Sequence, residues 1–144
     1  MSNFPSLHFT EEQGLAIELI NKTGTTSVKG TVVQASSAMN ESFESQADQD
    51  DNIGVVYQNG IADGERCLIV IAGIAQVLLE NSTASVRGNW VFASTVDGRA
   101  NATLTTPPGG GIPEHDEHFK EIGHCVESKD AGTDVLAKII LHFN

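Results

Sequence analysis

The residues best suited to chemistry gather in the stretch TTPPGGGIPEHDEHFKEIGHC, which spans positions 105–125. It places three histidines and a cysteine within eleven positions, among several acidic residues; the four are His115, His118, His124 and Cys125. Imidazoles, thiolates and carboxylates are the usual ligands of zinc, and a cysteine activated by a histidine is a common catalytic nucleophile. The stretch therefore raises two hypotheses, a metal site and a catalytic cysteine.

The spacing argues against a metal site. On a helix, His115 and His118 would share one face, but the preceding PPGGGIP favours an extended loop. In the strand expected next, His124 and Cys125 point to opposite faces, so they cannot both be ligands. The pattern also matches no common structural zinc signature. We expect no metal and no cofactor, with metal-dependent chemistry through His115, His118 and His124 as the weakest alternative.

Enzymatic chemistry is equally disfavoured, and we predict that the protein is not an enzyme. A catalytic cysteine needs an electropositive setting, whereas the neighbours of Cys125 are acidic or apolar and would raise its pKa. The glycines at 109–111 are followed by Pro113 and acidic residues rather than by a helix start with a lysine, so they do not form a phosphate loop. Trp90, the only tryptophan, alternates with Phe92 and is expected in the core or at a subunit interface.

Composition excludes several classes of partner. The chain has 144 residues, enough for one domain with a real core. A net charge of −11 disfavours nucleic acid and an anionic membrane surface, because both require clustered basic residues. No apolar run approaches a membrane helix, and the N-terminus lacks the features of a signal peptide. Cys67 and Cys125 are expected as free buried thiols in a reducing compartment, although a single disulfide between them stays open.

The elements around these residues are predicted to be strands. From 135 to 144 one alternating set is wholly apolar and the other mixed, which is typical of a strand with one buried face. Similar patterns predict strands at 15–21, 28–36, 53–58 and 89–95, separated by Asn-Gly and Asp-Gly turns. The apolar run 65–81 is expected to form two strand segments hinged at Gly73. Helix is limited to 82–87 and 114–121. The chain is thus predicted to be an all-β barrel or sandwich.

Two segments depart from this pattern. Residues 1–14 carry apolar side chains around Pro5 without a clear period, and we expect an extended N-terminal arm ahead of a single domain at 15–144. The acidic stretch at 41–51 is expected to be a solvated loop or an edge strand.

Four segments resemble a known family. They read INKTGTTSVKGTVV, NIGVVYQNGIADGERCLIVIAGIAQVLLEN, SVRGNWV and HFKEIGHCVESKDAGTDVLAKIILHFN. In order and spacing, from about residue 18 onward, they are similar to the small capsid decoration (cement) proteins of tailed bacteriophages.

The resemblance implies a β-tulip-like barrel or sandwich that binds the outside of a phage capsid. The partner would be the major capsid protein, the oligomer a trimer, and the role reinforcement of the expanded shell. The protein would be made in the cytoplasm of the bacterial host and located on the virion exterior. The candidate capsid contacts are Phe4, Pro5, Leu7 and Phe9, and the candidate subunit-interface residues are Trp90, His115 and His118. The alternative is a host-surface or glycan-binding module displayed on the virion, with Trp90 as its platform.

Overall fold

The computed structural model describes residues 7–49, 51–103 and 119–143. All ten elements of these residues are strands, which confirms the predicted all-β fold: β1 (His8–Phe9), β2 (Gly14–Asn21), β3 (Val32–Ala35), β4 (Ser42–Ser45), β5 (Asn52–Val56), β6 (Arg66–Leu78), β7 (Trp90–Ala93), β8 (Ala100–Thr103), β9 (Glu121–Cys125) and β10 (Leu136–Leu141). No helix in this part of the chain has the length and apolar character needed to span a membrane.

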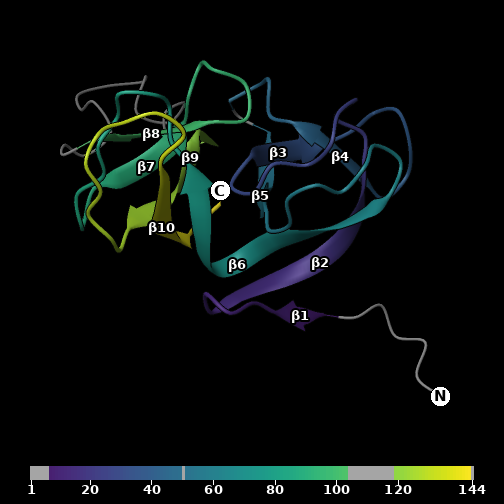
Figure 1. Cartoon of the computed structure of the whole chain (residues 1–144), viewed down its shortest axis with the longest axis horizontal. Coiled ribbons are helices and arrows are strands. Elements are labelled where there is room, and N and C mark those ends of the chain that lie inside the picture. Colours follow the sequence, from purple (N-terminus) through teal and green to yellow (C-terminus); the bar gives the residue numbers. More distant parts are fainter. Residues whose placement is uncertain (1–6, 50, 104–118, 144) are drawn as a thin grey trace.

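Five strands close into a barrel, and the others extend from it. The barrel follows the order β2-β4-β3-β5-β6 and closes where β6 pairs with β2. β1 pairs with β2 outside the ring, so these two strands form a short hairpin. The far half of β6 continues into a second sheet in the order β6-β10-β9-β7-β8. Figure 1 shows this second sheet beside the barrel, with β6 running from one to the other.

The bend in β6 that joins the barrel to the second sheet lies at Gly73. β6 pairs with β2 as far as Gly73 and with β10 from Ile74 onward. Gly73 has a φ of 77°, a conformation that other residues rarely adopt. The predicted hinge at Gly73 is thus confirmed: the two segments on either side of it pair with different strands, although they form one continuous strand of 13 residues.

Two apolar cores result from this arrangement. One fills the barrel with side chains from all five of its strands, and the other lies between the barrel wall and the second sheet. Adjacent residues divide between them: Val33 and Val56 belong to the barrel core, whereas Val32 and Val55 belong to the second. Strands buried on both faces carry consecutive apolar residues, which explains the long apolar run of β6. The two cysteines are free and buried, Cys67 in the barrel core and Cys125 in the second.

Two local predictions are corrected, and a third lies mainly outside the described residues. In the acidic stretch 41–51, residues 46–49 and 51 lie outside any strand, as predicted for a loop. Residues 42–45, however, form β4, which pairs with both β2 and β3 and is therefore neither a solvated loop nor an edge strand. It is held there because Phe43 is fully buried in the barrel core. The segment 82–87 is not helical but forms turns and a bridge from Ser85 to Lys129. The second predicted helix lies mainly outside the described residues, and its last position, Glu121, begins β9.

Candidate functional site

A β-bulge in β9 determines which of its side chains share a face. Across β7 and β9, Trp90 pairs with His124 and Phe92 pairs with Glu121, which leaves Ile122 as the extra residue. Trp90 and Phe92 are two residues apart and lie on one face of β7. Glu121 and His124 therefore lie on one face of β9, although residues three apart in a regular strand point in opposite directions.

The end of β10 adds a third residue to this face. Ile140 pairs with His124, and His142 follows two positions later. The backbone N–H of His142 donates a hydrogen bond to the carbonyl oxygen of Ile122 at 2.6 Å. This bond holds the backbone of His142 next to the bulge, so its imidazole lies beside Glu121.

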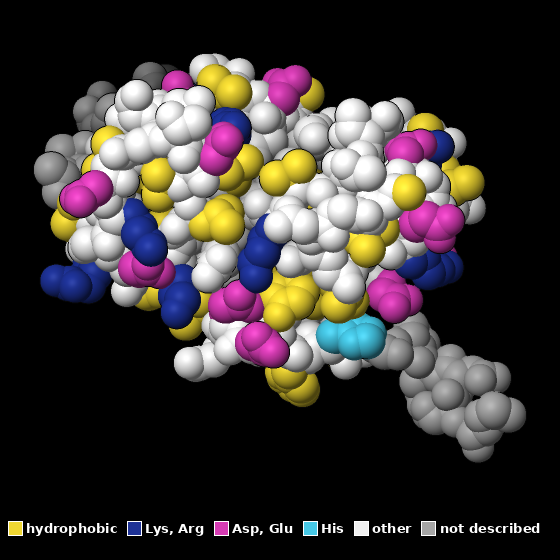
Figure 2. All heavy atoms as spheres, viewed as in Figure 1, with side chains coloured by type: hydrophobic (Ala, Val, Ile, Leu, Met, Phe, Trp, Pro, Cys, Tyr) yellow, Lys and Arg dark blue, Asp and Glu magenta, His cyan; other side chains and the backbone are white. Residues whose placement is uncertain are grey.

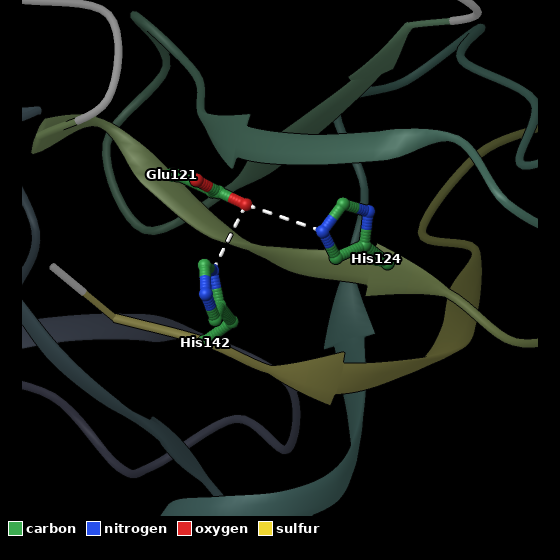
Figure 3. A group of neighbouring side chains, drawn as sticks. All are labelled: Glu121, His124 and His142. Atoms are coloured by element: carbon green, nitrogen blue, oxygen red, sulfur yellow. Dashed lines mark hydrogen bonds and ion pairs between the residues drawn. The ribbon is translucent and has the colours of Figure 1, made fainter. Parts of the chain in front are cut away.

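Glu121, His124 and His142 form what we call the histidine–glutamate cluster (Figure 3). Glu121 Oε1 is 3.3 Å from His124 Nε2 and 3.0 Å from His142 Nδ1. The Glu121 side chain is only 3% exposed, whereas those of His124 and His142 are 35% and 56% exposed. One oxygen of a buried carboxylate is thus approached by two imidazoles that solvent can reach.

Neighbouring residues hold the cluster in place. The ring of Trp90 packs against His124 with their centroids 4.6 Å apart, and the two imidazole rings are 5.9 Å apart. Gly123 allows β9 and β10 to lie close together, because a Cβ at this position would overlap the carbonyl oxygen of Ile140. Any side chain at 123 would separate the strands that carry the cluster.

The cluster offers two nitrogen ligands and one oxygen ligand within 4.8 Å of one another. Of the candidate metal ligands singled out from the sequence, His124 belongs to the cluster, whereas His115 and His118 lie outside the described residues. Cys125 points to the opposite face, into the second core, as predicted. Sequence reasoning missed His142 and the role of Glu121. The alternation of the last strand places His142 with Lys138 and Ile140 on its outer face, but nothing local indicates which strand lies beside it.

The cysteines have the environment of core residues. Burial raises the pKa of the Cys125 thiol, as predicted, and it also raises the pKa of Cys67. The thiolate is the reactive form of cysteine, so both side chains are poor nucleophiles at neutral pH.

The predicted contact residues are only partly described. Leu7 and Phe9 belong to the N-terminal hairpin and are 65% and 87% exposed. Trp90 is half-buried beside His124. Phe4, Pro5, His115 and His118 lie outside the described residues, so their roles stay predictions.

One of the open surface hollows formed by the described residues is lined by side chains of both charges. It has a volume of about 700 Å³ and is lined by residues of β6, β10 and the loop before β10, among them Gln76, Glu127, Lys129 and Lys138. Acidic, basic and hydrophobic side chains are interspersed on the face shown in Figure 2. The lining of the hollow therefore has the same mixed character as the rest of this surface, whereas pockets for small ligands are mostly apolar.

Comparison with known proteins identifies a likeness of fold. No family model matches the chain, and no curated protein matches it. Among solved structures it is similar to one described as the crystal structure of head fiber gp8.5 N base in bacteriophage phi29. The two share 15% sequence identity, the match covers 88% of this chain and 92% of the other, and the TM-score is 0.54. The similar structure is that of a phage head-fibre base, so the resemblance to decoration proteins is not confirmed, and at this identity the likeness concerns the fold.

Proposed function

We propose that the protein is a virion structural protein that binds the outer surface of a bacteriophage capsid as a decoration protein and stabilises the expanded shell. The observation that carries the proposal is the likeness to the phage head-fibre base, which extends over 88% of this chain and 92% of that one. The segments that resemble decoration proteins point to the same class of protein, since both are components of the phage head.

The N-terminal hairpin is the part of the domain best suited to contact the capsid. Leu7 and Phe9 are among its most exposed apolar side chains. β1 lies at one end of the strand order among the described residues, so a capsid strand could pair with it by β-augmentation. In a homotrimer, three such hairpins would combine modest affinities by avidity.

The hairpin is firmly attached to the barrel. The ammonium group of Lys29 donates a hydrogen bond to Glu12 at 2.7 Å and lies 4.6 Å from the centre of the Tyr57 ring. Glu12 belongs to the turn between β1 and β2, so this ion pair fastens the turn to the barrel. The strand that carries Phe9 is thus presented from a fixed base.

A reconstitution experiment tests the proposal. Expanded capsids that lack the protein would be mixed with purified protein, sedimented, and then exposed to heat and osmotic shock. We expect saturable binding at symmetric positions and a higher temperature of capsid disruption. Absence of binding, or full occupancy without any gain in resistance, would contradict the corresponding part of the proposal. Binding to host glycans without binding to capsids would favour the alternative module.

The hairpin contact has its own test. Replacing Leu7 and Phe9 together by serine should weaken capsid binding at least tenfold, because burying each apolar side chain contributes about 1.5–3 kcal/mol. Both side chains are exposed, so the fold should be preserved. The matched control is Val86→Ser, which removes an apolar side chain that is 44% exposed on another loop. Equal binding by the double variant and the control would exclude the hairpin as the contact.

A further inference from the structure

The histidine–glutamate cluster has the composition of a metal site. Imidazole nitrogens with one carboxylate oxygen suit zinc and the neighbouring transition metals, whereas calcium and magnesium prefer sites made of oxygen. The three ligand atoms, Glu121 Oε1, His124 Nε2 and His142 Nδ1, lie within 4.8 Å of one another. We propose that Glu121, His124 and His142 bind a divalent transition-metal ion of the zinc class, which links β9 to the end of β10.

The distances require only a small adjustment. With metal–ligand bonds of about 2.0–2.2 Å, ligand atoms of a tetrahedral zinc site lie roughly 3.3–3.5 Å apart. The two oxygen–nitrogen distances, 3.3 Å and 3.0 Å, are already close to this value. The remaining approach of the two nitrogens can come from His142, which follows the last strand and has a side chain that is 56% exposed. The strands need not move.

The backbone around the cluster is fixed in advance. The bulge at Ile122 puts Glu121 and His124 on one face, and the hydrogen bond from His142 to Ile122 aligns the third ligand. Trp90 restricts the ring of His124. Restraints of this kind reduce the entropy lost when a metal binds, and they resemble the supporting groups around known metal ligands.

Access and charge also favour a cation. Both imidazoles are partly exposed, so an ion can enter from the outer face of the sheet, and a net charge of −11 attracts cations to the surface. Three protein ligands leave a fourth position for water or for a group from a neighbouring molecule. The inference does not depend on the proposed virion role.

Titration of the full-length protein with Co²⁺ and with Zn²⁺ tests the site. We expect one ion per chain, visible Co²⁺ absorption bands that Zn²⁺ abolishes, and an increase in melting temperature with added Zn²⁺. His142→Ala and Glu121→Gln should each weaken binding at least tenfold. His8→Ala, which removes a histidine on β1, is the matched control and should leave the affinity unchanged. Because Glu121 is buried, the exposed His142 provides the variant that is expected to stay folded.

Two results would overturn the proposal. The first is the absence of stoichiometric binding by the wild-type protein. The second is binding that persists in His142→Ala and disappears in a His115→Ala/His118→Ala variant, which would assign the metal to the histidines of the preceding segment. Both results concern metal in the isolated protein, so they are separate from success or failure of capsid binding.

Discussion

Replacing Gly73 by alanine would test whether the bend in β6 holds the barrel and the second sheet together. Gly73 has a φ of 77°, and a Cβ built there would lie 2.5 Å from the carbonyl oxygen of Gln13 and 3.1 Å from the Cα of Gly14. Both contacts are with backbone, which cannot rotate away as a side chain can. To make room for the Cβ, β6 would have to move away from β2 at the point where the barrel meets the second sheet.

Two costs contribute to the expected loss of stability. A left-handed conformation costs an alanine roughly 1–2 kcal/mol, and overpacking at a closely packed site typically costs about 1–3 kcal/mol more. The matched control is Gly60→Ala, because Gly60 has a φ of 79° but nothing within 4 Å of its Cβ position. Gly60→Ala carries only the conformational cost, and both variants reduce the entropy of the unfolded chain equally.

Thermal unfolding and urea titration would measure the difference. An unfolding entropy of about 2.1 cal/mol/K per residue gives a chain of this length about 0.3 kcal/mol/K, so each kcal/mol lowers the melting temperature by about 3 °C. We expect a decrease of about 3–6 °C for Gly60→Ala and about 6–15 °C for Gly73→Ala. Equal decreases for the two variants would refute the reasoning, since the close approach to Gln13 would then contribute nothing.

Two other predictions concern the barrel. Phe43→Ala should reduce the free energy of unfolding in urea by about 3–5 kcal/mol, because Phe43 is fully buried in the barrel core. Burial alone would raise the pKa of Glu12, but its hydrogen bond and charge interaction with Lys29 lower it overall. The ion pair therefore stabilises the protein above the ordinary glutamate pKa of 4.5, and this contribution is lost as pH falls through the lower folded pKa. Lys29→Met should cost about 1–2 kcal/mol at pH 7 and progressively less in urea titrations below pH 4; a difference that does not vary with pH would contradict this account.

The sequence predicted strands well where one face is buried. In β10, Ala137 and Ile139 are fully buried whereas Ile140 is 45% exposed, as the alternation indicated. The alternation of apolar and polar residues is reliable there because only every second side chain of the strand faces the core. The same local pattern predicted β2 and β5 to within a few residues.

The prediction failed where the structure depends on pairing between strands that are separated in the sequence. β4 has the sequence SFES, with one apolar residue among polar ones, and its composition resembles a surface loop. Its position in the barrel depends on hydrogen bonds to β2 and β3, and on a place for Phe43 inside the ring. Neither partner strand can be identified from residues 41–51 alone, so the local composition was misleading.

The sequence around the histidine–glutamate cluster does contain one signal that predicts its bulge. In a regular strand, Glu121 would share a face with Cys125, which is buried in the second core, and an ionised carboxylate in an apolar core is costly. An extra residue at Ile122 moves Glu121 to the outer face, where two imidazoles reach its oxygen. The same displacement sends Ile122, which is fully buried, into the second core. In the sequence, a glutamate thus stands at a position whose side chain would face the core in a regular strand, and an isoleucine and a glycine follow it directly. This combination indicates a bulge. Identification of His142 as the third member still requires the pairing of β9 with β10, which no local pattern supplies.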